Sequence, residues 1–246
     1  MADSLGRIAV VARHDLRVLR RDPVYLVTFT LMPIVYMAFA EGALSTEQVV
    51  PGAAVVFSGF MVGNLGFAVF NEHGWHTWDR LRASRLNTAE LFVGKAIVPV
   101  ISLGLQLAVL LGAGALLFDL QVAGPWLGVI LVAAAFAVME VALGFALLAL
   151  CTSVLQLNAL TSVGALLFGG LGGAVAPVDS LPDWAQAIAP FTPAYWAMQG
   201  FTDVIIEGEG VSAVVTPVLV LAGFAVGFTV VAVLRLRVDE AKTSWA

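Results

Sequence analysis

Apolar residues in this chain form long runs, and the charged residues gather in short segments between those runs. A helix of about 20 residues crosses the hydrocarbon core of a bilayer, so the runs predict six transmembrane helices. We expect these helices at residues 24–44, 49–71, 96–118, 125–150, 159–176 and 212–234. The predicted fold is therefore an all-α polytopic membrane protein, with residues 1–246 as one transmembrane domain.

The boundary between the fourth and fifth spans is less obvious, because residues 141–178 contain no charged residue. A single helix over that stretch would be about 57 Å long, which is far more than the bilayer core of about 30 Å. The polar cluster from Thr152 to Asn158 is the place where we expect the chain to turn back.

Basic residues predict the orientation. All 12 Lys and Arg residues lie within residues 7–21, 80–95 and 235–242. Loops rich in Lys and Arg stay in the cytoplasm, so we predict a multi-pass protein of the bacterial plasma membrane with both termini and the 72–95 loop inside. The turn after the fourth span follows to the same side by parity. The net charge of −5 is divided between the two sides, and we expect no nucleic-acid partner.

Residues 1–22 predict an amphipathic helix that lies in the membrane interface, with lipid as its partner. At about 100° per residue, one side is apolar and carries Leu5, Ile8, Ala9, Ala12, Leu16 and Leu19. The other side carries Arg7, Arg13, Arg17, Arg20 and Arg21. Asp22-Pro23 should end this helix, because the residue before a proline is pushed out of the helical region.

Residues 72–95 form the longest predicted cytoplasmic connection. Trp75, Trp78 and Leu81 recur at helical spacing beside basic residues, which is typical of a short helix against a protein partner or lipid headgroups. The sequence from Asn87 to Glu90 has the pattern of a capping box, in which the Asn side chain and the Glu side chain each bind a backbone amide. We expect that box to start the helix of the third span.

Residues 177–210 are too polar and too rich in proline to cross the membrane, and we expect them outside the cell. Ser180-Leu-Pro-Asp183 predicts the start of one short helix, and a second is expected from Ala194 to about Ile206. Two such helices can lie on the outer leaflet or dip into it. Either arrangement would cover the external mouth of a pathway.

Three polar side chains are expected inside the spans, namely Glu140, Asn64 and Gln106. An ionisable residue within the membrane is expensive, so Glu140 must face protein or water, or be protonated, and its default role is functional. We assign all three residues to a candidate translocation pathway. Hydrogen bonding between helices is the alternative for each of them, and for the two amides it is the better explanation. The glycine-rich run from Gly169 to Gly173 permits close helix approach or local unwinding.

The motifs of an enzyme are missing from the chain. It has no phosphate-binding loop, no cofactor fingerprint and no catalytic triad pattern, so any ATP must bind elsewhere. The single cysteine, Cys151, excludes a disulfide framework. His73 and His76 lie beside Glu72 without a further expected ligand, and we predict no metal site and no bound cofactor.

Three segments, in this order, resemble the permease subunits of ATP-binding-cassette exporters of the type-2 family, which export drugs, antibiotics and polysaccharides. The first is Arg20-Arg-Asp-Pro23, ahead of a span that contains Pro33. The second lies between the second and third expected spans and contains Glu72, Gly74, Thr77, Leu81-Arg-Ala-Ser84 and Gly94-Lys95. The third lies between the last two spans and contains Pro177, Leu181-Pro-Asp-Trp184, Pro190, Pro193 and Tyr195.

This resemblance implies half of a membrane pore, which pairs with a second permease subunit in a homo- or heterodimer. Two separate ATPase subunits would bind ATP and Mg²⁺ and drive alternating access. The residues that the resemblance assigns to ATPase coupling are Arg20, Arg21, Asp22, Glu72, Gly74, Thr77, Arg80, Leu81 and Arg82. Those that it assigns to an external gate are Pro177, Pro182, Trp184, Pro193 and Tyr195.

We therefore predict an ATP-driven exporter permease for a drug-like or lipid-like amphiphile. One alternative is a proton-coupled secondary transporter that uses Glu140 as its relay. Another is a membrane assembly protein that transports nothing. A proton-coupled carrier would not need the basic and aromatic loop at residues 72–95, and an assembly protein would not need Glu140.

Overall fold

The computed structural model describes residues 2–40, 42, 44–74 and 87–235, and assigns no β-strand among them. The α-helices are α1 (Ala2–Arg21), α2 (Val24–Ala40), α3 (Thr46–Gly74), α5 (Thr88–Leu117), α6 (Trp126–Leu150), α7 (Val154–Leu171), α8 (Asp183–Ile188), α9 (Pro193–Ile205) and α10 (Val215–Arg235). Two short 3-10 turns, Val178–Ser180 and Ala189–Phe191, flank α8.

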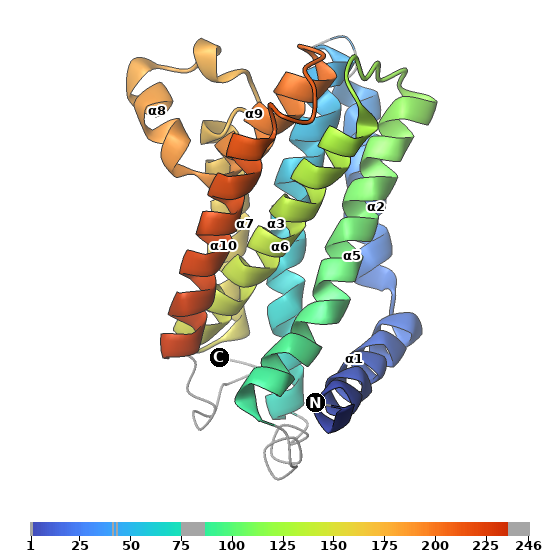
Figure 1. Ribbon diagram of the computed structural model, residues 1–246, viewed down its shortest axis with the longest axis vertical. Helices are drawn as coiled ribbons and strands as arrows, with labels where there is room; N and C mark the ends of the chain where they lie inside the picture. The colour runs from blue at the N-terminus through green and yellow to red at the C-terminus, as the bar shows by residue number, and fades with distance from the viewer. Residues whose placement is uncertain (1, 41, 43, 75–86, 236–246) are drawn as a thin grey trace.

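The long helices run side by side as a bundle (Figure 1). Within the described residues, four of them, α5, α6, α7 and α10, are long and apolar enough to cross a membrane. The count rises to five if the bent pair of α1 and α2 is taken as one span. An all-helical membrane fold is therefore confirmed, and the number of six spans remains a prediction.

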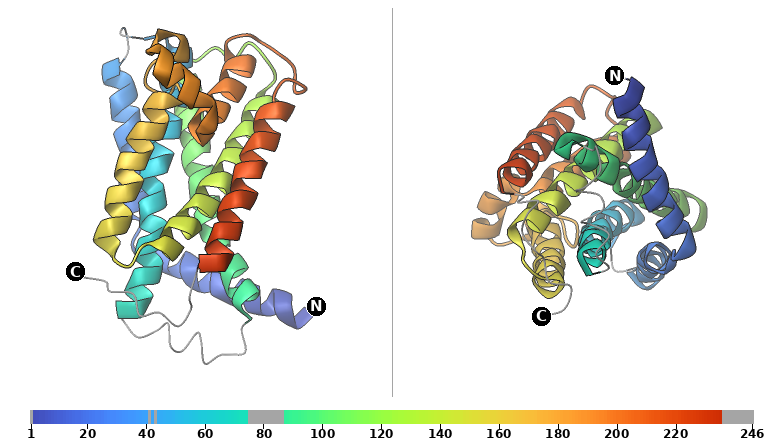
Figure 2. Two further views of the ribbon diagram at one scale, coloured as in Figure 1. Left: turned by 90° about the vertical axis from the view of Figure 1, so that its left-hand side faces the viewer. Right: turned by 90° about the horizontal axis from the view of Figure 1, so that it is seen from below.

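The bundle has two distinct ends. α1 lies across one of them, which we call the α1 end, and α8 and α9 lie at the opposite one, the α8 end (Figures 1 and 2). α1 and α2 meet at an angle of 65°. The bend falls at Asp22-Pro23, as predicted, and the Asp22 side chain accepts a hydrogen bond from the amide of Val24 at 3.4 Å.

Two helix starts show how well local polar patterns can be read. α5 begins at Thr88 behind the predicted capping box of Asn87 and Glu90. The turn between α6 and α7 falls at residues 151–153, also as predicted. The expected bounds of the fifth span, 159–176, are wrong, because Ser153 accepts a hydrogen bond from the amide of Gln156 and caps α7 from Val154.

The segment at the α8 end follows the prediction only in part. α9 begins at Pro193 and ends at Ile205, close to the expected bounds. Ser180 does not cap a helix, because its hydroxyl donates to the Pro177 carbonyl at 2.6 Å within a 3-10 turn. α8 begins at Asp183 with no side-chain cap.

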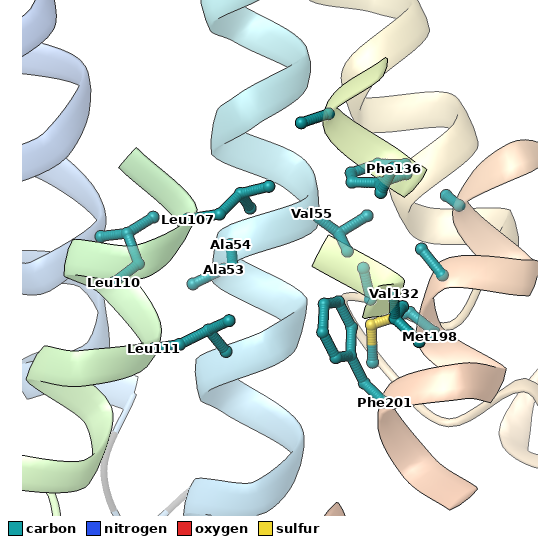
Figure 3. Close-up of a cluster of buried hydrophobic side chains, with 14 of the residues drawn as sticks. Ala53, Ala54, Val55, Leu107, Leu110, Leu111, Val132, Phe136, Met198 and Phe201 are labelled. Atoms are coloured by element: carbon teal, nitrogen blue, oxygen red, sulfur yellow. The ribbon is translucent and has the colours of Figure 1, made fainter. Parts of the chain in front are cut away.

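Small residues let the helices approach closely around the buried core. Figure 3 shows part of this core, in which α3 contributes small side chains and its neighbours contribute larger ones. A Cβ added to Gly59 of α3 would lie 2.9 Å from the Cβ of Ala165 in α7, and one added to Gly169 of α7 would lie 2.6 Å from Val56. The predicted close approach at the glycine-rich run is therefore confirmed, since small residues bring membrane helices together.

Candidate functional site

α1 is attached to the start of α5 by an ion pair. The guanidinium of Arg7 donates to both carboxylate oxygens of Glu90, with N–O distances of 2.9 and 2.6 Å. Glu90 also accepts from the amide of Asn87 at 3.0 Å. The same carboxylate therefore caps α5 and binds α1, and a fork of two parallel bonds fixes the orientation of the two helices.

A second ion pair lies further along the same two helices. Lys95 Nζ is 2.8 Å from the Asp15 carboxylate, and these side chains are only 5% and 14% exposed. Val11 lies between the two pairs, where a Cβ added to Gly94 would come within 2.8 Å of the Val11 Cβ. In the Gly94-Lys95 motif, the missing side chain of Gly94 leaves room for Val11 to pack against α5, and Lys95 supplies a buried positive charge that pairs with α1.

The predicted apolar side of α1 is only partly covered. Leu5, Ala9 and Leu16 are exposed, whereas the other three residues of that side, Ile8, Ala12 and Leu19, are half-buried. The arginines predicted for coupling, Arg20 and Arg21, are exposed at the end of α1. The helix itself is confirmed, and its contact with lipid stays a prediction. Such a contact requires an exposed apolar stripe beside exposed arginines, and α1 has both.

The rest of the predicted coupling site lies around the ends of α3 and α5. Glu72 and Gly74 belong to the last turns of α3, which end at the α1 end of the bundle (Figure 2). The remaining members, Thr77, Arg80, Leu81 and Arg82, fall outside the described residues. The structure therefore brings α1, the end of α3 and the start of α5 to one end of the molecule.

The turn between α6 and α7 also lies at the α1 end, as the parity argument expected (Figure 1). A separate hydrophobic cluster joins it to α1 and α5 and consists of Val11, Leu91, Leu148, Cys151, Val154 and Leu157. Cys151 is fully buried there. No local sequence pattern predicts this cluster, because its members come from four helices and from the turn between α6 and α7.

Glu140 is buried in the middle of α6, with only 3% of its surface exposed. Its carboxyl faces α3, where it hydrogen-bonds with Ser58 and lies 3.7 Å from the position of a Cβ on Gly59. Its Oε2 atom has no hydrogen-bond partner among the described residues. A buried carboxyl oxygen without a partner is costly, so this group is well placed to bind a donor or exchange a proton.

Gln106 of α5 is fully buried and has a clear structural task. Pro33 has no amide hydrogen, so the Phe29 carbonyl one turn earlier in α2 lacks its helical partner. The Gln106 amide donates to that carbonyl at 2.8 Å and to the Phe57 carbonyl of α3 at 3.3 Å. Gln106 therefore ties α2, α3 and α5 together. Asn64 lies in α3, and its side chain is outside the described residues.

The predicted external gate residues differ in their surroundings. Pro177, Pro182 and Trp184 are exposed, whereas Pro193 is buried and Tyr195 is half-buried. Tyr195 lies edge-on to Trp196, with ring centroids 5.4 Å apart. All five lie at the α8 end, but only the last two pack into the bundle.

Another contact at the α8 end was not predicted. The buried Gln48 side chain of α3 donates to the Gly173 carbonyl at 2.6 Å. One turn further along α3, a Cβ on Gly52 would overlap the Ala174 carbonyl. These two residues hold the turn from Gly172 to Ala174, which leads into the segment with the predicted gate residues.

Comparisons with known proteins point to one family of membrane proteins. Residues 7–206 match the family described as "ABC-2 type transporter". A similar curated protein is the linearmycin resistance permease protein LnrN of Bacillus subtilis (strain 168), which is 28% identical over 162 residues. That alignment covers 63% of this chain and 39% of the relative, so the chain spans about two-fifths of the relative's length.

Proposed function

Because the chain belongs to the ABC-2 type transporter family, we propose that it is the membrane-spanning permease subunit of an ATP-driven exporter. The domain of this family is a membrane transport component and not the ATP-binding part. A drug-like or lipid-like amphiphile is the proposed substrate class, since a similar protein is named a resistance permease. The observation that supports the proposal most is the ion-paired attachment of α1 to α5, beside the end of α3.

In the proposed complex, this chain pairs with a second permease subunit, identical or not, and with two ATPase subunits that bind ATP and Mg²⁺. Six spans place both termini and the 72–95 loop in the cytoplasm of a bacterium and residues 177–210 outside. Every Lys and Arg of the described residues lies at the α1 end, and that distribution supports the orientation.

ATP-driven movement would enter at the α1 end, through the coupling residues of α1 and of the 72–95 loop. Closure of the ATPases would tilt the helices as rigid bodies and open the pathway at the α8 end. Glu140, Asn64 and Gln106 are proposed for the pathway, and the five gate residues for its outer closure. For Gln106, the hydrogen bond to Phe29 favours a role in helix packing.

A proton-coupled carrier is the second candidate, and one observation favours it. The Oε2 atom of Glu140 has no partner among the described residues, as expected for a group that takes up and releases a proton.

Efflux from proteoliposomes separates the two candidates. Wild type and Glu140→Gln are reconstituted with a candidate ATP-binding-cassette ATPase, and efflux is measured with ATP and without a pH gradient. We expect ATP-dependent efflux in both proteins, because Gln keeps the shape and one acceptor. Transport that requires the gradient, ignores ATP and disappears in Glu140→Gln would contradict the ATP-driven exporter.

A further inference from the structure

The attachment of α1 is more specific than an interfacial helix requires. A helix held only by lipid would leave its charges in water or at phosphates. Here the carboxylate of Asp15 and the ammonium of Lys95 are both largely buried, although their helices are far apart in the sequence. Desolvation opposes such a pair, so the attraction between the two charges offsets its cost only if they are held in good geometry.

The charges also define the register between the two helices. α1 carries Arg7 and then Asp15, and α5 carries Glu90 and then Lys95, so the signs run in opposite order. A slip that moved Arg7 toward Lys95 would bring like charges together, which is unfavourable. Only one alignment satisfies both pairs, and Val11 is seated on Gly94 in that alignment.

α5 connects α1 to the rest of the bundle at two places along its length. Near its start, Leu91 and Val11 pack together against the turn between α6 and α7. Further along, Gln106 of α5 binds carbonyls of α2 and α3. A displacement of α1 that moves α5 with it would therefore reach every one of these helices.

We propose that the Arg7–Glu90 and Asp15–Lys95 pairs form a two-point latch that makes α1 and α5 move as one body. The latch rests on the proposed function for its purpose, which is to carry ATP-driven movement from the α1 end into the bundle. Its four residues are positioning residues, because they act through the helices that they join.

The first test replaces the buried ion pair by a covalent link. Asp15→Cys and Lys95→Cys are combined in a Cys151→Ser background, and the thiols are joined by a short bifunctional maleimide. Without the linker we expect at least a tenfold loss of transport, with ATP hydrolysis by the complex no longer stimulated by substrate. With the linker, transport should recover to within about threefold of the Cys151→Ser background. If crosslinking lowers transport further, the helices must separate during the cycle and the latch is wrong.

The second test uses the ion pair itself and guards against a folding defect. Asp15→Lys and Lys95→Asp are made singly and together, and transport is expressed per folded molecule. Each single change should uncouple hydrolysis from transport, and the exchanged pair should restore coupling. Restored thermal stability without restored coupling would show a structural role only and would overturn the latch.

The third test does not depend on transport, so failure of the latch can be told from failure of the exporter assignment. Spin labels are attached at the exposed positions Ala9 and Val93 in the Cys151→Ser background, and their separation is measured by pulsed electron resonance. One narrow distance is expected in the wild-type latch and a broad distribution in Asp15→Asn. A broad distribution with the latch intact would refute rigid attachment, even if ATP-dependent efflux were confirmed.

Discussion

The two ends of the bundle are held together by different chemistry. At the α1 end, side chains of opposite charge join α1 and α5, and they come from positions about 80 residues apart. At the α8 end, where the described residues include no Lys or Arg, backbone carbonyls bind Gln48 and press against Gly52. Ion pairs select one register, whereas close backbone contacts select small residues. The α1 end is therefore sensitive to charge and the α8 end to volume.

The prediction with the largest expected effect is that the two ends of the bundle face opposite sides of a membrane. Single cysteines are placed at the exposed positions Gln121, Asp179 and Glu209 near the α8 end, and at Arg13 and Thr152 at the α1 end, in a Cys151→Ser background. An impermeant thiol reagent added to intact cells should label only the first group. Labelling of Arg13→Cys or Thr152→Cys from outside would reverse the proposed orientation.

A change in volume at the α8 end should be the most damaging to stability. Gly52→Ala places a Cβ on the Ala174 carbonyl, and such overpacking should lower the free energy of unfolding by about 3 kcal/mol. Gly112→Ala in α5 is the matched control, because its Cβ would meet nothing within 4 Å. Thermal unfolding in detergent measures both. Equal unfolding temperatures would contradict the close contact.

A change in charge at the α1 end should come next. Lys95→Met leaves the Asp15 carboxylate without its buried partner, which should cost about 2 to 3 kcal/mol of unfolding free energy after allowance for partial exposure. Arg7→Gln should cost less, because the Arg7 side chain is 39% exposed and water can replace it. Chemical unfolding of both variants tests this order of free-energy losses. A larger loss in Arg7→Gln than in Lys95→Met would show that the buried Asp15–Lys95 pair contributes little to stability.

The smallest expected effect concerns Gln106, midway between the ends. Gln106→Leu removes the donor to the Phe29 carbonyl and should cost about 1 to 2 kcal/mol. In a Pro33→Ala background the helix regains an amide for that carbonyl, so the same change should cost less. Thermal unfolding of the four proteins gives the coupling energy. Independent, additive effects would mean that Gln106 does not compensate for the proline.

Helix boundaries could be predicted wherever one short segment contains both donor and acceptor. The break at Asp22-Pro23 and the capping box of Asn87 and Glu90 are of this kind, and both are confirmed. Ser180 shows the limit of this reading. A serine three residues before Asp183 has the pattern of a cap, but its hydroxyl binds the Pro177 carbonyl instead. Two local partners compete there, and residue type alone does not decide between them.

By itself, the sequence determined the membrane class, the helical content and the separation of basic residues from the rest of the chain. These properties follow from composition and spacing, because a bilayer demands apolar runs of a fixed length. Only the tertiary structure decided three contacts. Glu90 forms an ion pair with Arg7, Val11 packs against Gly94, and Gln106 donates to the Phe29 carbonyl, which lacks a helical partner because of Pro33. The reason is physical: each contact joins helices that are distant in the chain, and their packing selects the partner from many residues of the same type.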